Sequence, residues 1–171
     1  MNDYITISLS KYGKNKGKFE AVISTEDAIL AESNWCVSVS KYTNYALRKN
    51  DRNKKPNLIS LHREVMKRML GHDIPDGMEI DHIDGNGLNC ARPNLRLATK
   101  SQNGVNRGKN KNNTSGYKGV QWSKQKNKWM ATIWVKDKSE YIGYFDTREL
   151  AYEAYCQKAK ELHGEFANLG D

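Results

Sequence analysis

The chain has 171 residues, and a hydrophobic content of 37% excludes wholesale disorder while leaving room for one domain or two small ones. Its formal net charge of +8 makes a polyanion the expected partner. No apolar run approaches membrane length, and the three scattered cysteines include no Cys-x-x-Cys pair. We therefore expect no membrane span, no disulfide framework and no structural zinc, in a soluble, intracellular protein.

Residues 1–60 form a β-rich region of no assigned role, in which short strand-like runs alternate with polar turns. The strands are expected at Tyr4–Leu9, Phe19–Ile23, Trp35–Val39, Tyr45–Arg48 and Leu58–Leu61. One short helix is expected over Ala28–Ala31, because Ser24–Asp27 supplies a cap and early acidic residues. The lysines of this region lie mostly in turns, where solvated lysines normally lie.

Residues 61–107 are expected to form a helix followed by a strand–loop–strand–helix unit. The first helix is predicted over residues 62–72, because apolar residues recur there at spacings of three and four and Gly71 ends the run. The two strands and the last helix are expected at Met78–Ile83, Leu95–Ala98 and Thr99–Arg107. A loop rich in Gly and Asn separates the strands.

Residues 108–116 are a polar linker rich in Gly, Asn and Lys, and residues 117–169 form a last module. Its strands are expected at Tyr117–Trp122, Lys128–Val135 and Glu140–Phe145. The segment Asp146–Glu149 resembles a capping box that opens a helix through Leu162. The sequence thus predicts a three-stranded antiparallel sheet packed on one helix, in a chain of the α+β class.

Positive charge is concentrated in one third of the chain. From Gly85 to Lys136 there is no Asp or Glu. The basic residues of this stretch are Arg92, Arg96, Lys100, Arg107, Lys109, Lys111, Lys118, Lys124, Lys126, Lys128 and Lys136. Because aromatic residues are interleaved with them, we favour a surface that follows DNA phosphates over a merely solvated face.

The stretch Glu79–Asn86 contains the residue types that phosphodiester hydrolysis requires. The reaction needs a base to activate water and a positive group against the developing charge. A neutral imidazole such as His82 suits the first task, and a divalent cation held by carboxylate and amide oxygens suits the second. Neighbouring strand residues point to opposite faces, so Asp81 and His82 share a site only if a bulge or the strand's end brings them together.

Four blocks occur in order between residues 60 and 107, namely Leu61–Val65, Ile80–Asn86, Pro93–Arg96 and Ser101–Asn103. Together they resemble the HNH endonucleases, particularly the phage and intron-encoded homing type. The resemblance implies a ββα-metal HNH nuclease domain over residues 61–107. It also implies a divalent metal ion as cofactor, Mg²⁺ with Mn²⁺ as the alternative.

The resemblance assigns a role to each of four residues. His82 would be the general base that activates water, Asp81 the first metal ligand, and Asn103, on the last helix of the unit, the second. Asn94 would pin the loop and orient the His82 ring. His62 is a possible accessory residue that contacts phosphate or buttresses the site, although packing at a helix start explains it equally well.

A second set of blocks consists of Tyr117–Val120, Lys128–Ile133, Tyr141–Thr147, Ala151–Tyr155 and Ala167–Leu169. It resembles the apetala/ethylene-response-factor DNA-binding domain, whose sheet enters the major groove. The positions that would face DNA are Lys118, Gln121, Lys128, Thr132, Trp134 and Tyr141, together with Trp122, which either stacks on DNA or packs on a turn. The linker is interpreted either as a flexible tether along DNA or as an ordinary spacer.

We therefore predict a site-specific DNA endonuclease from a phage or bacterial setting, with double-stranded DNA as its partner. A monomer would nick one strand, and a dimer would break both. The alternative from another class is a non-catalytic DNA-binding regulator that uses the HNH unit as a scaffold, and a third is an RNA-binding protein. The presence of all four site residues favours the nuclease.

Overall fold

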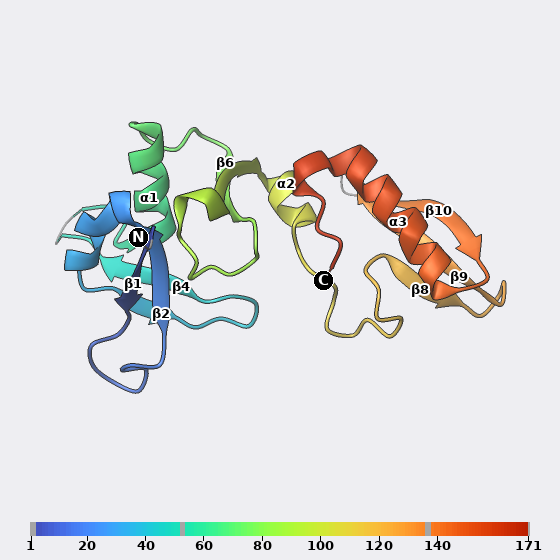
Figure 1. The fold of residues 1–171 in the computed structure, drawn as a ribbon, viewed down its shortest axis with the longest axis horizontal. Helices are drawn as coiled ribbons and strands as arrows, with labels where there is room; N and C mark the ends of the chain where they lie inside the picture. Colours follow the sequence, from blue (N-terminus) through green and yellow to red (C-terminus); the bar gives the residue numbers. More distant parts are fainter. Residues whose placement is uncertain (1–2, 52–53, 136–137, 171) are drawn as a thin grey trace. The chain divides into compact units, whose positions relative to one another are not determined.

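The computed structural model describes residues 3–51, 54–135 and 138–170 and has the predicted α+β architecture (Figure 1). The chain divides into two compact units, Met1–Ala98 and Thr99–Asp171. Within the described ranges, no helix is both long and apolar enough to cross a lipid bilayer.

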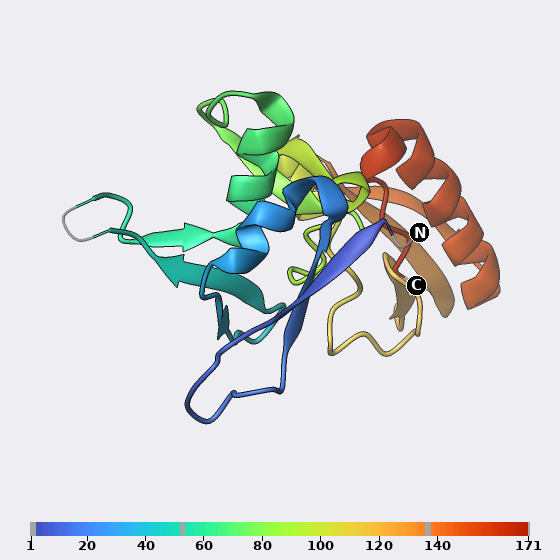
Figure 2. The same ribbon diagram turned by 60° about the vertical axis from the view of Figure 1, so that its left-hand side comes forward.

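Three small sheets build the N-terminal unit: β1 with β2, the order β3–β4–β5, and β6 with β7. The strands are β1 Tyr4–Ser8, β2 Glu20–Ser24, β3 Cys36–Ser38, β4 Tyr45–Lys49, β5 Leu58–Ser60, β6 Met78–His82 and β7 Leu95–Thr99. The helices are the 3-10 helix η1 Thr25–Glu32, α1 Leu61–Leu70 and the 3-10 helix η2 Arg92–Asn94. Within this unit η1 lies beside α1 (Figure 2).

Helix α1 ends two residues earlier than the sequence predicts. Gly71 adopts the left-handed conformation (φ 74°), and its N–H donates to the Lys67 carbonyl at 2.9 Å. Glycine adopts this conformation without the clash that a Cβ would cause, so the helix stops here. The following segment then leads into β6, whose last residue is His82.

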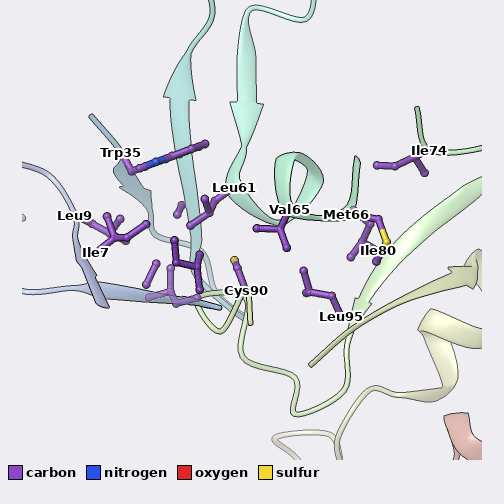
Figure 3. Close-up of a cluster of buried hydrophobic side chains, with 14 residues drawn as sticks. Ile7, Leu9, Trp35, Leu61, Val65, Met66, Ile74, Ile80, Cys90 and Leu95 are labelled. Atoms are coloured by element: carbon purple, nitrogen blue, oxygen red, sulfur yellow. The ribbon is translucent and has the colours of Figure 1, made fainter. Parts of the chain in front are cut away.

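The N-terminal strands and the segments around α1, β6 and β7 share one apolar core (Figure 3). The buried side chains of this core are Ile7, Leu9, Ala21, Ile23, Trp35, Ala46, Leu61, Val65, Met66, Ile74, Ile80, Leu88, Cys90 and Leu95. Residues 1–60 therefore complete the core on which the elements from α1 to β7 are built.

Strand β2 also holds the loop that follows β6. The Val22 N–H donates to the Leu88 carbonyl at 2.9 Å, and the Cys90 N–H donates to the Val22 carbonyl at 2.8 Å. These bonds form a parallel bridge between Val22 and Asn89. The N-terminal region thus constrains the backbone on which the candidate site lies.

The C-terminal unit contains the predicted sheet and helix, with strand order β10–β9–β8 and antiparallel pairing. Its elements are α2 Lys100–Val105, β8 Val120–Ser123, β9 Lys128–Val135, β10 Lys138–Phe145, α3 Arg148–His163 and the 3-10 helix η3 Gly164–Phe166. Helix α3 lies along the sheet (Figure 1). Strand β10 starts at Lys138, two residues before the expected start at Glu140, and residues 136–137 lie outside the described residues.

Small residues allow α3 to approach the sheet closely. Ala131 and Ile133 of β9 are buried together with Ala151, Tyr155 and Ala159 of α3. Leu162, near the end of the same helix, is 39% exposed.

Strand β8 begins three residues later than predicted because a turn precedes it. Gly119 has a φ of +73°, and a Cβ there would lie 2.2 Å from the Tyr155 ring and 2.7 Å from the Thr132 carbonyl oxygen. Only glycine fits this close approach of backbone to helix.

Candidate functional site

The neighbours Asp81 and His82 end strand β6, and both are buried, at 3% and 6% exposure. Arg96 of β7 donates from Nε to Asp81 Oδ2 at 2.8 Å, and its Nη2 lies 2.8 Å from the same oxygen. His82 instead lies among aromatic rings. The two residues thus have different contacts, as their alternation on a strand requires.

His82 packs against two rings from distant parts of the N-terminal unit. Its ring centroid is 5.1 Å from that of His62 on α1, in an edge-on arrangement, and 6.0 Å from that of Tyr45 on β4. Tyr45 and His62 are 5.4 Å apart. The accessory position that the sequence assigned to His62 therefore lies beside the candidate base, and the Tyr45 contact was not anticipated.

Burial keeps both imidazoles neutral. It lowers the pKa of His82 below the usual 6.5, although the charges of Asp84 and Asp81 act in the opposite direction. Burial, with the neighbouring His82 and Arg63, lowers the pKa of His62 to about 3. A neutral imidazole is the form that accepts a proton, so the His82 environment suits a general base.

Asn94 braces both ends of the loop after β6. Its Oδ1 accepts a hydrogen bond from the Asp84 N–H at 3.1 Å, and its Nδ2 donates to Asp84 Oδ1 at 2.9 Å and to the Asn89 carbonyl at 2.8 Å. In addition, the Ile83 N–H donates to the Asn94 carbonyl at 2.9 Å. These bonds hold the backbone directly after His82 in one conformation.

The Asp84 carboxylate organises the rest of this loop. Its Oδ1 also accepts from the Asn86 N–H at 2.8 Å, and its Oδ2 accepts from Asn89 Nδ2 at 2.8 Å. Burial alone would raise the pKa of Asp84, but these hydrogen bonds and those from Asn94 lower it. The carboxylate is therefore ionised and engaged within the loop.

The loop between β3 and β4 packs against the same segment. Thr43 Oγ1 accepts a hydrogen bond from the Gly87 N–H at 2.8 Å. A Cβ at Gly87 would lie 2.5 Å from the Asn44 carbonyl oxygen and 2.7 Å from the Tyr45 ring. Gly87 is thus required by close packing, a contact between distant segments that no local motif signals.

A second feature that the sequence did not reveal is an ion cluster around the buried carboxylate of Asp27. Asp27 of η1 is fully buried and accepts from Arg68 Nε of α1 at 2.8 Å. Arg92 of η2 donates to the same carboxylate from Nε at 2.7 Å and from Nη2 at 2.9 Å. Burial alone would raise the pKa of Asp27, but the two guanidinium groups lower it. The cluster ties η1, α1 and η2 together.

The proposed metal ligands belong to different units of the chain. Asp81 lies on β6, and Asn103 lies on α2, which begins directly after β7 with Thr99 as its cap. In the parts of the chain that the structure describes, no group of three or more His, Cys, Asp or Glu residues could hold a metal ion. A carboxylate and an amide oxygen are nevertheless the donor types that a hard divalent cation prefers.

One face of the C-terminal sheet collects most of the residues expected to face DNA. Directly opposed strand residues share a face, and the register pairs Thr132 with Tyr141 and Gln121 with Met130. Lys128 and Trp134 lie on this face by alternation along β9. Trp134 is 61% exposed and Tyr141 57% exposed, so large aromatic surfaces are available there.

Two of the predicted DNA-facing residues have other surroundings. Trp122 is paired in register with Trp129, whose side chain packs in the sheet–helix core, and the two ring centroids are 5.1 Å apart. Trp122 therefore belongs to the helix side of the sheet. Lys118 donates from Nζ to the carbonyls of Val105, Arg107 and Asn168 at 2.9, 2.6 and 2.8 Å. The three N–H donors of Lys118 are thus used inside the protein. For these reasons we remove Trp122 and Lys118 from the proposed DNA-facing set.

Comparison with known proteins identifies two matching family models. Residues 60–105 match the model described as HNH endonuclease, and residues 115–165 match that of the AP2 domain. Protein 3.8 of Escherichia phage T7 is 45% identical over 96 residues, which are 56% of this chain and 78% of that protein. An uncharacterized HNH endonuclease of Acanthamoeba polyphaga mimivirus is 33% identical over 156 residues, 91% of this chain and 76% of that protein. No solved structure matches.

Proposed function

The chain belongs to the HNH endonuclease family, and from that premise we propose that it cuts double-stranded DNA at specific sites by metal-assisted hydrolysis. The family matches confirm both resemblances seen in the sequence, the nuclease unit and the C-terminal AP2 domain. The observation that carries the proposal is the buried imidazole of His82, whose lowered pKa leaves it neutral beside a loop braced by Asn94.

In the proposed reaction His82 accepts a proton from the attacking water, and Asn94 keeps the backbone after His82 in place. His62 and Tyr45 restrict the His82 ring by packing against it. Asp81 and Asn103 are proposed to hold the divalent ion, Mg²⁺ or Mn²⁺. Such an ion, when bound, stabilises the charge that develops on the phosphate and on the leaving oxygen.

Arg96 orients the Asp81 carboxylate. Its two contacts, both 2.8 Å, are made to Oδ2. Two donors on one oxygen restrict rotation of the Asp81 carboxylate. Arg96 is 13% exposed in its side chain, so this pair is shielded from solvent screening.

We propose that the AP2 sheet directs the cut to its site. Gln121, Lys128, Thr132, Trp134 and Tyr141 form one face, called here the reading face, which combines hydrogen-bonding, cationic and aromatic groups. Such groups suit base edges and phosphates of a duplex.

We further propose that the protein is a homing-type or free-standing enzyme of a phage or bacterial setting. It would act on intracellular DNA as a monomer and nick one strand.

The test is cleavage of supercoiled plasmid that contains candidate target DNA, with Mg²⁺ or Mn²⁺ and with chelator. Wild-type protein is expected to relax or linearise the plasmid only with metal. The variants Asp81→Ala and His82→Ala are expected to lose cleavage by roughly a hundredfold or more, since a positioned base alone contributes about 10²–10⁴. The control is His72→Ala, an exposed histidine outside the site.

Two results would contradict the proposal. Metal-dependent cleavage that both site variants retain would show that the active site lies elsewhere. Tight DNA binding without cleavage of any substrate would favour the non-catalytic regulator. In that case the ion pair between Arg96 and Asp81 would have a purely structural role.

A further inference from the structure

Helix α2, which contains Asn103, is short and needs help at its C-terminal end. It comprises Lys100–Val105, and a capping box between Thr99 and Gln102 closes its N-terminal end. A helix leaves its last carbonyls without partners inside the helix. The carbonyls at and beyond the end of α2 are bound instead by residues that lie far along the chain.

Lys118 provides the first connection. Its Nζ donates to the carbonyls of Val105 at 2.9 Å and Arg107 at 2.6 Å, and also to that of Asn168 at 2.8 Å. An ammonium group at a helix C-terminus interacts favourably with the helix dipole. Lys118 is half-buried, and this burial lowers its pKa to about 8.

Asn168 provides the second connection. Its Nδ2 donates to the carbonyl of Asn106 at 2.8 Å and to Asn106 Oδ1 at 3.2 Å. Its Oδ1 accepts from the Gly170 N–H at 2.7 Å, which fixes the orientation of the amide. Asn106 itself is 8% exposed, and its N–H donates back to the Gln102 carbonyl of α2 at 3.3 Å.

Both connecting residues belong to the sheet–helix module. Lys118 directly precedes Gly119 and β8, and the tail that contains Asn168 is attached to α3 by the Tyr152 hydroxyl, which donates to the Leu169 carbonyl at 3.2 Å. A Cβ at Gly170 would lie 2.8 Å from Lys118 Cβ, so the tail packs directly on the lysine. Helix α2 is therefore anchored to the module that bears the reading face.

We propose that Lys118 and Asn168 are positioning residues for cleavage, which anchor α2 and its Asn103 to the DNA-reading module. This inference rests on the proposed function. Helix α2 precedes the loop at residues 108–116 in the chain and is already bound to the sheet–helix module that follows the loop. This loop therefore does not separate two independent modules. A DNA site that binds the reading face thereby also sets the position of the Asn103 amide.

The test uses the full chain and the variants Lys118→Met and Asn168→Asp. The aspartate keeps the acceptor for Gly170 but removes both donor contacts to Asn106, and it leaves Lys118 in place. The control is Lys109→Met. Lys109 is an exposed lysine of the loop at residues 108–116, and it donates to one carbonyl, that of Gly116, at 3.1 Å. Three quantities are measured: kcat and KM for plasmid cleavage, DNA affinity in chelator, and amide hydrogen exchange over residues 100–105 without metal.

Both variants are expected to lower kcat roughly tenfold to a hundredfold, the scale that a small misplacement of a site residue produces. DNA affinity and KM should stay within about twofold, and exchange over α2 should become faster. The control should match wild type in all three measurements.

Three outcomes would overturn the inference. The first is wild-type kcat in both variants while wild-type protein cuts. The second is loss of DNA affinity in proportion to cleavage, which would mean that the residues serve only the reader. The third is unchanged exchange over α2. If wild-type protein cuts no DNA, the proposed function fails, whereas the exchange measurement still decides whether Lys118 and Asn168 anchor α2.

Discussion

The arginines of the N-terminal unit and Lys128 of the C-terminal sheet have different kinds of partner. In the N-terminal unit, arginines are bound to buried carboxylates, as Arg68 and Arg92 are to Asp27 and Arg96 is to Asp81. In the C-terminal unit, Lys128 lies on an exposed sheet face, and its partner Asp146 is 80% exposed. Charge therefore shapes the candidate catalytic site in one unit and is available for DNA phosphates in the other.

Aromatic residues differ in the same sense. Tyr45 packs on the histidines of the candidate site in the N-terminal unit. Trp134 and Tyr141 are more than half exposed on the C-terminal sheet. Residue type alone therefore does not reveal function, because the same groups serve as scaffold or as contact surface according to burial.

The largest effect is expected from breaking the ion cluster around Asp27. Asp27→Ala should lower the free energy of unfolding by about 3 kcal/mol, because it removes three charge-assisted hydrogen bonds from Arg68 and Arg92, whose partly exposed guanidinium groups then bind water instead. Denaturant titration of the full chain measures the loss. The matched control is Asp73→Ala, which removes an exposed ion pair with Lys67 and should leave the unfolding midpoint unchanged. Equal effects of the two variants would refute a structural cluster.

The next effect concerns the reading face. Trp134→Ala should weaken DNA binding in chelator by roughly tenfold or more, since a central interface aromatic contributes about 2 kcal/mol. The stability of the protein should change little, because this side chain is 61% exposed. Tyr42→Ala removes a more exposed aromatic of the N-terminal unit and serves as the control. If the control weakens binding as much as Trp134→Ala does, the contrast between the two units is wrong.

The smallest effect is a shift in pH dependence. Burial lowers the pKa of His82 below 6.5, so the base stays neutral at pH values where an exposed histidine is protonated. Protonation removes the base, and cleavage is therefore expected to fall only below pH 6.5. The profile of kcat/KM against pH, at saturating metal, measures the midpoint of this acidic limb. A midpoint at or above 6.5 would contradict a buried His82 base.

Local sequence predicted most of the elements correctly because their signals are local. Apolar spacing and Gly71 identified helix α1, and the strand expected at Lys128–Val135 is β9 with the same bounds. The helix starts are less exact: Thr99 caps α2, but α3 is capped by Thr147, which accepts from the Leu150 N–H, and not by Asp146 of the expected capping box. Several element ends were predicted less exactly, such as the start of β8, where the Gly119 turn packs against a distant helix.

Residue identity and spacing along the chain are enough to indicate the family, the order of the site blocks and the residues proposed for catalysis. Which groups meet across long separations depends on the folded structure. Arg92 reaches Asp27 over 65 positions, and Lys118 reaches Asn168 over 50. No periodicity encodes such partners, since they are selected by packing, and burial then decides whether a charged side chain is a scaffold or a DNA contact.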